Sequence, residues 1–329
     1  MSGIELSIAT SDYDHVRDLI NSRVRAEGIH LIPTELPVEE IFFRMFSFTE
    51  WDIAEFSMAK YVSLIGTGTA PFRAIPVFPS RVFRQSAFYV ATDSSVRSPE
   101  DLAGKRVGIP EWAQTAGIYA RAFLQHQCRV HLADIHWVQA GVNQAGRSEK
   151  VTLSLPDGVK IEQVRDRSLN ELLLAGDLDG IISAREPTAF LARDPKIARL
   201  WPDYRSIEES YYRDTGIFPI MHVIVIKNEV LSRHPWIAMN LFRAFSDAKT
   251  NSLKRLSSIV NSSVAIPWMH QAYDHAKNTF GEDFWPYGIE GNQRTLEAFL
   301  QYCNEQGVTQ RTVSIEELFP RELSRTVSV

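Results

Sequence analysis

Arginine residues next to aromatic residues are the groups in this sequence best suited to bind a small anion. Arg81 and Arg84 lie together with Ser80 in the segment IPVFPSRVFR, and Arg185 directly follows a predicted strand. A guanidinium group can donate two parallel hydrogen bonds to one carboxylate. We expect Arg185 to be the main carboxylate ligand, and we prefer Arg81 to Arg84 because Arg81 follows a rigid Phe-Pro pair. For each arginine the alternative is an ion pair at the protein surface.

Two residues are candidates for proton transfer. His222 lies in the apolar run IFPIMHVIVIK, and an imidazole can donate or accept a proton near neutral pH. Glu111 lies in the segment GIPEWAQTAG and would need strong desolvation to keep its proton at pH 7. We therefore expect His222 to be the proton donor, with Glu111 as the second catalytic candidate. A histidine packed in the core and a glutamate paired with an arginine are the alternatives.

Further polar residues are predicted to face the same site because each lies at the end of a strand or at the start of a helix. Thr115 begins a predicted helix, where free backbone N–H groups can hold an anion. Glu55 and Ser57 end one predicted strand, and Tyr13 follows the first strand. Residues just beyond the carboxyl ends of parallel strands line the crevice in open α/β sheets. An ordinary capped turn at Thr115 and a packing role for Tyr13 are the alternatives.

Strand and helix patterns alternate along the chain and provide the scaffold for these residues. Alternating apolar residues predict a strand with Leu6 and Ile8, and further strands at 29–36, 52–56 and 72–78. Between these strands the apolar residues follow helical spacing. Repeated β-α-β units predict an α/β protein with mostly parallel sheets and helices on both faces.

Two extended apolar runs, at 86–92 and 217–227, interrupt this alternation, and a second series of strands and helices lies between them. We therefore predict that the chain leaves one lobe at the first run and returns at the second. Lobe one would comprise 1–87 plus 221–329, and lobe two would comprise 88–220. Two strands that cross between lobes form a hinge, and the cleft between the lobes is the expected ligand site.

The composition argues against several classes of protein. The 329 residues carry a formal charge of −5 and no basic tract, which argues against nucleic-acid binding. No apolar run approaches the ~20 residues needed to span a bilayer, and the N-terminus lacks the pattern of a secretory signal. We therefore expect a cytoplasmic protein that binds neither nucleic acid nor membrane. Cys128 and Cys303 lie far apart, so we expect reduced structural thiols and no metal site.

Several segments resemble a known family. The segment SPEDLAGKRVG is similar to the start of the second lobe in type II periplasmic binding proteins and their cytoplasmic relatives. The segments IPVFPSRVFR, GIPEWAQTAG, YYRDTGIFPIMH and WPYG together resemble the 4,5-dihydroxyphthalate decarboxylase family, and the resemblance runs along essentially the whole chain. It implies a two-lobed type II periplasmic-binding-protein-like fold. It also implies a decarboxylase that acts on a hydroxylated phthalate in aromatic catabolism.

The implied reaction requires no cofactor or metal. Each carboxylate-bearing carbon of 4,5-dihydroxyphthalate lies para to one hydroxyl, so ionising that hydroxyl pushes electron density onto the carbon. A proton is then delivered to this carbon and CO₂ is lost, with the ring itself as the electron sink. The expected partner is a small aromatic dicarboxylate, and a homo-oligomer is left open. A non-catalytic binding protein for aromatic acids and another small-molecule enzyme of the same fold are the alternatives.

Overall fold

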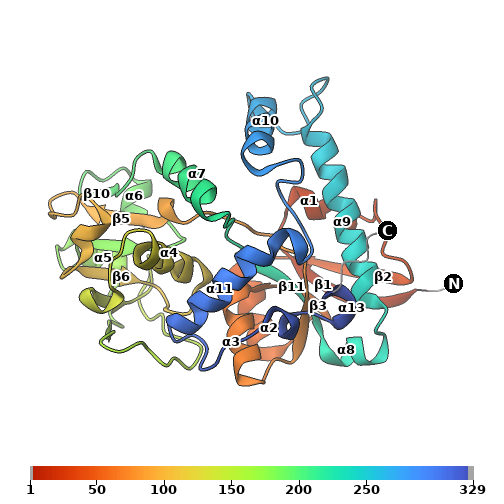
Figure 1. The fold of residues 1–329 in the computed structure, drawn as a ribbon, viewed down its shortest axis with the longest axis horizontal. Helices are drawn as coiled ribbons and strands as arrows, with labels where there is room; N and C mark the ends of the chain where they lie inside the picture. The colour runs from red at the N-terminus through yellow and green to blue at the C-terminus, as the bar shows by residue number, and fades with distance from the viewer. Residues whose placement is uncertain (1–2, 325–329) are drawn as a thin grey trace.

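The computed structural model describes residues 3–324 and has two lobes joined by two crossing segments (Figure 1). Each lobe is built on its own β-sheet, with helices packed against it. One lobe contains both ends of the chain, and the other is formed by the middle of the chain. The two-lobed α/β architecture expected from the sequence is therefore confirmed, whereas the lobe boundaries to the residue stay a prediction.

The sheet of lobe one has the strand order β2-β1-β3-β11-β4. Its strands are β1 (Ile4–Thr10), β2 (Ile29–Glu35), β3 (Ile53–Ser57), β4 (Phe72–Ile75) and β11 (His222–Lys227). Strand β1 pairs in parallel with β2 and β3, whereas β11 runs antiparallel to β3 and β4. The expectation of a mostly parallel sheet is confirmed, because β1, β2, β3 and β4 all run in the same direction and only β11, which returns from the other lobe, runs in the opposite one.

The helices of lobe one cover both faces of this sheet. They are α1 (Asp14–Ile20), α2 (Val38–Phe48), α3 (Met58–Thr67), α8 (Asn228–Arg233), α9 (Ile237–Leu256), α10 (Met269–Phe280), α11 (Gln293–Glu305), α12 (Ile315–Leu318) and α13 (Arg321–Ser324). Apolar residues at helical spacing face the sheet: Val16 and Leu19 of α1 and Leu241 and Phe245 of α9 are buried in one cluster with Ile8. This packing fixes α1 directly beside the end of β1.

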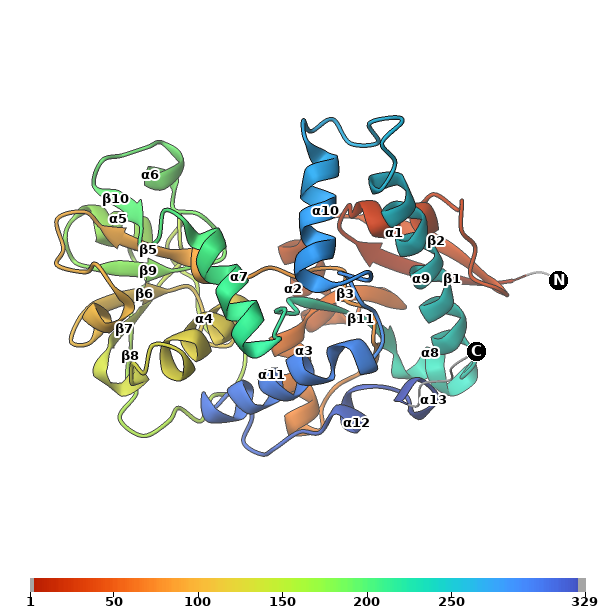
Figure 2. The same cartoon turned by 45° about the horizontal axis from the view of Figure 1, so that its top comes forward.

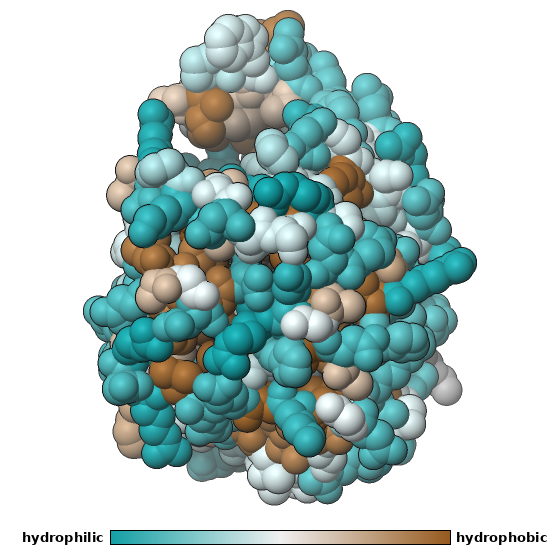
Figure 3. Space-filling model, turned by 90° about the vertical axis from the view of Figure 1, so that its left-hand side faces the viewer, coloured by the Kyte–Doolittle hydropathy of each residue, from teal (hydrophilic) through white to brown (hydrophobic). Residues whose placement is uncertain are grey.

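The sheet of lobe two has the order β10-β5-β9-β6-β7-β8. Its strands are β5 (Phe88–Ala91), β6 (Arg106–Ile109), β7 (His136–Gln139), β8 (Ile161–Gln163), β9 (Gly180–Ile182) and β10 (Ile197–Arg199). Its α-helices are α4 (Thr115–His126), α5 (Leu169–Leu174), α6 (Thr188–Leu191) and α7 (Tyr204–Thr215). Strand β10, which has 3 residues, was not predicted from the sequence. The outer surface of this lobe is mostly hydrophilic, with scattered hydrophobic residues (Figure 3).

The two crossing segments lie side by side at the hinge. The backbone of Arg81 pairs with that of Ile220 in an antiparallel bridge, and the N–H of Met221 donates to the carbonyl of Ser80 at 2.8 Å. The carbonyl of Met221 accepts in turn from the N–H of Met58 at 3.0 Å, at the start of α3. These bonds bring the residues that precede β11 against the residues that end β3.

A buried interface between α4 and α11 attaches the lobes to each other outside the hinge. The ring of Tyr119 stacks on that of Phe299 with centroids 4.9 Å apart. Trp112 donates its indole N–H to the carbonyl of Gln306 at 2.7 Å, and Nε of the fully buried Arg121 donates to the Gln306 side chain at 2.9 Å. The second lobe is therefore held by more than its two crossing segments.

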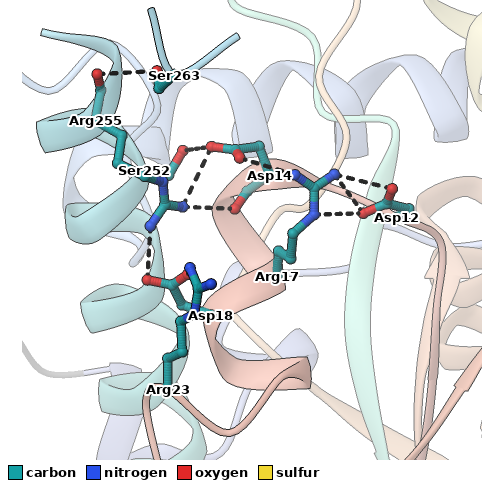
Figure 4. Close-up of polar contacts among 8 residues, drawn as sticks. All are labelled: Asp12, Asp14, Arg17, Asp18, Arg23, Ser252, Arg255 and Ser263. Carbon is teal, nitrogen blue, oxygen red and sulfur yellow. Dashed lines mark hydrogen bonds and ion pairs between the residues drawn. The ribbon is translucent and has the colours of Figure 1, made fainter. Parts of the chain in front are cut away.

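A network of polar contacts ties α1 to α9 (Figure 4). Arg255 of α9 donates to the carboxylate of Asp18 at 2.8 Å, and Ser252 donates to Asp14 at the start of α1. Arg17 pairs with Asp12 at 2.8 Å on the opposite side of α1. The network holds the first turn of α1 in place, and that turn directly follows Tyr13.

Helix α10 and the loop that joins it to α9 project beyond the rest of lobe one (Figure 2). Helix α10 has no buried residue, but His275 contacts Glu209 of α7 at 2.7 Å. Neither α9 nor α10, nor any other described helix, is long and apolar enough to cross a membrane.

Candidate active site

A cleft of about 920 Å³ lies between the two lobes. Its walls come from α2 and the end of β3 in lobe one, and from residues of the segments 110–116, 141–150 and 183–185 in lobe two. Arg84 and His222 line it at the hinge. A cavity of this size accommodates a substituted benzene ring and its polar groups.

His222 and Glu55 form a close pair at this cleft. Nδ1 of His222 lies 2.6 Å from Oε1 of Glu55, and the hydroxyl of Tyr13 donates to the same oxygen at 2.6 Å. Oε2 of Glu55 accepts from the backbone N–H of Ser11 at 3.0 Å. Glu55 is 0% exposed, whereas the His222 side chain is 16% exposed. The pair therefore presents the imidazole, and not the carboxylate, to the cleft.

The Glu55 carboxylate also fixes which ring nitrogen of His222 carries a proton. A carboxylate only accepts hydrogen bonds, so Nδ1 must be the donor. Burial, followed by the nearby Glu55 charge, raises the pKa of Tyr13 far above its ordinary value, so Tyr13 also stays a donor. Nε2 of His222 has no hydrogen-bond partner within residues 3–324 and is left for a ligand in the cleft.

The register of β11 against β3 brings this pair together. The Cα atom of His222 lies opposite that of Ser57, and Glu55 lies opposite Ile224. His222 and Glu55 are therefore diagonal neighbours on one face of the sheet, within reach of each other. The edge of the Phe42 ring packs against the imidazole, with centroids 4.8 Å apart and the planes at 83°. The imidazole is thus held between a carboxylate and an aromatic ring.

Arg84 brings a largely buried positive charge to the cleft. Its Nε lies 3.1 Å from Sδ of Met221, and its guanidinium makes no ion pair with any carboxylate in the described part of the chain. Burial lowers the pKa of Arg84 to about 10, with a smaller opposing effect from the charge of Glu208. Arg84 stays charged at neutral pH. The cleft therefore contains a positive charge with which an anionic ligand can pair.

Arg81 does not line the cleft, which corrects the preference for Arg81 over Arg84. The residue is 4% exposed, and its guanidinium donates to the carbonyls of Phe218 at 3.1 Å and Pro286 at 2.9 Å, and to the Asn292 side chain. The backbone of Arg81 forms the hinge bridge, which directs its side chain toward the turn before α11. Arg81 is therefore a structural residue that fastens the hinge to this turn.

Tyr13, Glu55 and Ser80 were expected to contact a ligand directly, but none of these side chains lines the cleft. Tyr13 and Glu55 contact His222 from behind, and the carbonyl of Ser80 accepts from the N–H of Met221 at the hinge. The ends of β1 and β3 do converge, as expected from the fold. Their polar side chains contact each other and His222, because Glu55 is fully buried on the same face of the sheet as His222.

Glu111 lines the cleft as a carboxylate and not as a proton donor. Nζ of Lys60 donates to its Oε2 at 2.6 Å, and Nε of Arg147 donates to its Oε1 at 2.7 Å. Burial acts to raise the pKa of Glu111, but these ion pairs outweigh burial and hold the pKa below its ordinary value. The expectation that Glu111 could act as a catalytic acid is therefore wrong, because its carboxylate is held in two ion pairs. Lys60 was not predicted as a site residue, although it follows the end of β3 closely, as Ser57 does.

Ser57 and Thr115 line the cleft and connect the lobes. Their hydroxyl oxygens lie 3.1 Å apart, and that of Thr115 accepts from the N–H of Ala59 at 3.0 Å. The start of α4 is therefore fixed against the end of β3. Contact of either hydroxyl with a ligand stays a prediction.

Arg185 lies at the mouth of the cleft and pairs there with Glu39 of α2, in the other lobe. The side chains are 62% and 47% exposed, respectively. A role in carboxylate binding stays a prediction for Arg185. Because Arg185 is exposed and already paired, we expect it to contribute less to carboxylate binding than the largely buried Arg84.

The described residues contain no group of three or more His, Cys, Asp or Glu side chains that could hold a metal ion. Both cysteines are free, and burial raises the pKa of Cys128 to about 12 and that of Cys303 still further. Neither thiol is a thiolate near neutral pH, so neither has the reactivity of a nucleophile.

His15, which packs between Tyr13 and Trp285 behind the site, should make the protein sensitive to acid. Burial lowers its pKa to about 4, and its Nε2 lies 3.1 Å from the carbonyl of Pro79. An unfolded chain takes up a proton at histidine near pH 6.5, whereas the folded protein resists it until about pH 4. The free energy of unfolding should therefore fall as the pH drops from 6.5 to 4, by about 3 kcal/mol from this residue. The stability lost in this way should be fully regained when the pH is raised above 6.5.

The variant His15→Gln keeps a donor for Pro79 but does not titrate. Urea unfolding at several pH values should give this variant a shallower loss of stability than the wild type between pH 6.5 and 4. Parallel pH curves for the two proteins would contradict the prediction. All other acid-sensitive groups are common to both.

Comparisons with known proteins give relatives in sequence and in fold. No protein-family model matches the chain. The 4,5-dihydroxyphthalate decarboxylase of Comamonas testosteroni is 37% identical over 320 residues, covering 97% of each chain. The protein of the same name from Pseudomonas putida is 37% identical over 214 residues, covering 65% of this chain and 83% of the relative.

Solved structures share the fold at low sequence identity. The periplasmic sulfonate-binding protein SsuA of Methylobacillus flagellatus has a TM-score of 0.58 at 13% identity, covering 98% of this chain and 93% of its own. The desulfurization enzyme DSZB has a TM-score of 0.55 at 15% identity, covering 97% of both chains. At these identities the similarity concerns the fold, and it confirms the periplasmic-binding-protein-like architecture expected from the sequence.

Proposed function

Because the chain belongs to the 4,5-dihydroxyphthalate decarboxylase family, we propose that it converts 4,5-dihydroxyphthalate to 3,4-dihydroxybenzoate and CO₂ in the cleft between its lobes. The family expected from the sequence motifs is confirmed by the full-length relative. One observation carries the proposal at the level of residues. The same cleft contains an imidazole with a free Nε2, on His222, and a largely buried cation without an anionic partner among the described residues, on Arg84.

Arg84 holds the carboxylate that is retained. A guanidinium in a largely buried position binds a carboxylate more strongly than an exposed one, because water competes less for both groups. The carboxylate also neutralises a charge that the protein leaves unpaired. Binding therefore orients the ring by its retained carboxylate, with the reacting carbon directed toward His222.

His222 supplies the proton to the ring carbon. When the para hydroxyl of the substrate releases its proton to water, electron density rises at this carbon, and the imidazolium then transfers its Nε2 proton there. The bond to the carboxylate then breaks, its electron pair restores the aromatic ring, CO₂ leaves, and the resulting phenolate takes up a proton again. Glu55 keeps the Nδ1 proton through its 2.6 Å contact and balances the positive charge of the imidazolium. Tyr13 holds Glu55 in place, so the imidazole does not need to reorient during the reaction.

The apolar part of the cleft assists the loss of CO₂. The departing carboxylate loses its charge on the way to the transition state, so surroundings that solvate this charge poorly favour the reaction. Phe42 and Phe46 of α2 line the cleft, and Phe42 contacts the His222 ring. The reacting carbon is thus protonated next to aromatic side chains.

Turnover of the named substrate tests the proposal. Purified protein incubated with 4,5-dihydroxyphthalate should release CO₂ and form 3,4-dihydroxybenzoate in equal amounts, as followed by gas detection and chromatography. Phthalate, which lacks the hydroxyls that supply the electrons, should bind without reacting. Tight binding of 4,5-dihydroxyphthalate without CO₂ above the uncatalysed rate would instead support a non-catalytic binding protein. A cytoplasmic location, a homo-oligomeric state and independence of cofactors remain predictions from the sequence.

A further inference from the structure

The ion pair between Arg185 and Glu39 spans the mouth of the same cleft. Glu39 lies in the first turn of α2 in lobe one, and Arg185 follows β9 in lobe two. Both side chains line the cavity, so the pair occupies space that a ligand must pass or enter. We propose that Glu39 is an internal competitor for Arg185, displaced by the second carboxylate of the substrate. The proposal rests on the proposed function, because it concerns a dicarboxylate that loses one carboxylate.

Arg185 differs from the other cations of the cleft in having a partner that is easily replaced. Lys60 and Arg147 both bind Glu111, whose side chain is only 2% exposed, and separating them would leave a buried charge unpaired. An exposed pair such as Arg185 with Glu39 contributes only about 0–1 kcal/mol. A carboxylate brought into the cleft by Arg84 can therefore compete with Glu39 at little cost.

The backbone at Arg185 stays in place while the side chain changes partner. The hydroxyl of Ser183 donates to the carbonyl of Arg185 at 2.8 Å and accepts from its N–H at 3.1 Å. Ser183 is 2% exposed, so this turn is anchored in lobe two. The exchange thus requires only the long, exposed side chain of Arg185 to move.

The exchange distinguishes substrate from product. The substrate offers one carboxylate to Arg84 and one to Arg185, whereas the product keeps only the first. When the second carboxylate leaves as neutral CO₂, Arg185 returns to Glu39 and the product has lost one of its contacts. A weak contact also suits a leaving carboxylate, because strong binding of its charge in the ground state would oppose decarboxylation.

Two unreactive ligands test the proposal without turnover. Phthalate has two carboxylates and benzoate has one, and neither has the hydroxyls that the reaction needs. Their affinities are measured by titration calorimetry for the wild type, Glu39→Gln, Arg185→Gln and the double variant. Glu40→Gln is the matched control, because Glu40 lies next to Glu39 on α2, pairs with Arg44 at 3.8 Å and does not line the cleft.

We expect Arg185→Gln to weaken phthalate binding by about 3- to 10-fold and to leave benzoate binding unchanged. Glu39→Gln should tighten phthalate binding by about 2- to 5-fold, and this gain should vanish in the Arg185→Gln background. Glu40→Gln removes the same charge from the same helix and should not change the affinity for either ligand. This control separates competition for Arg185 from a general loss of repulsion between the protein and the carboxylates of the ligand.

Three results would overturn the proposal: weaker phthalate binding in Glu39→Gln, the same gain with and without Arg185, or an equal change for benzoate. Failure of the proposed function is recognised separately. It would appear as the absence of CO₂ from 4,5-dihydroxyphthalate in a wild-type protein whose binding of phthalate and benzoate still follows the pattern above.

Discussion

His222→Asn should lower kcat by about 10²- to 10⁴-fold, the usual range for the loss of one general acid. Asparagine is polar and fits the same space, but it cannot transfer a proton near neutral pH. Binding of phthalate should change little, because Arg84 and Arg185 bind the carboxylates. The loss should therefore appear in kcat and not in affinity, as expected for a group that acts only in the transition state.

Steady-state kinetics with 4,5-dihydroxyphthalate and calorimetry with phthalate measure the two effects, and circular dichroism checks the fold. His126→Asn is the matched control, because His126 also contacts a glutamate, Glu305 at 2.8 Å, but does not line the cleft. Its kcat should equal that of the wild type. Near-full kcat in His222→Asn would make the contact with Glu55 a structural ion pair, and the proton would have to come from another group.

The secondary structure could be predicted from the sequence to a large extent, because each strand signal is local. The strands predicted around Leu6 and Ile8, at 29–36 and at 52–56 lie within a few residues of β1, β2 and β3. The direction of β11 was not predictable in the same way. A strand pattern is the same in both directions, and only the route of the chain through the other lobe determines that β11 runs antiparallel to β3.

The candidate site was predicted less well, because it depends on side-chain directions and on pairing between distant segments. Glu55 and His222 are 167 residues apart, and a shift of one residue in the pairing of β3 with β11 would place them on opposite faces. Arg81 and Arg84 show the same limit. They lie in a segment without regular structure apart from one bridge, so their spacing does not reveal which of them faces the cleft.

Arg84→Ala should reduce kcat/KM for 4,5-dihydroxyphthalate by about 30- to 1000-fold, equivalent to about 2–4 kcal/mol. The variant loses the charge that binds the retained carboxylate in a largely buried place. Arg84→Lys should recover only part of the activity, because an ammonium group cannot form two parallel hydrogen bonds. The melting temperature of Arg84→Ala should be equal to that of the wild type or higher, since the protein gives its guanidinium no anionic partner.

Arg81→Ala provides the matched contrast, because it removes the same side chain from the other face of the same segment. The carbonyl of Phe218 and the Asn292 side-chain oxygen would lose their donor, whereas the carbonyl of Pro286 would keep the one from Asn292. An unsatisfied buried acceptor costs about 1–3 kcal/mol. This variant should therefore lose stability, seen as a lower melting temperature. The folded fraction should keep much of its affinity for benzoate, which binds through one carboxylate, whereas Arg84→Ala should lose that affinity without losing stability. If Arg84→Ala bound benzoate as the wild type does, the carboxylate would have to be bound by another cation of the cleft, with Lys60 as the next residue to replace.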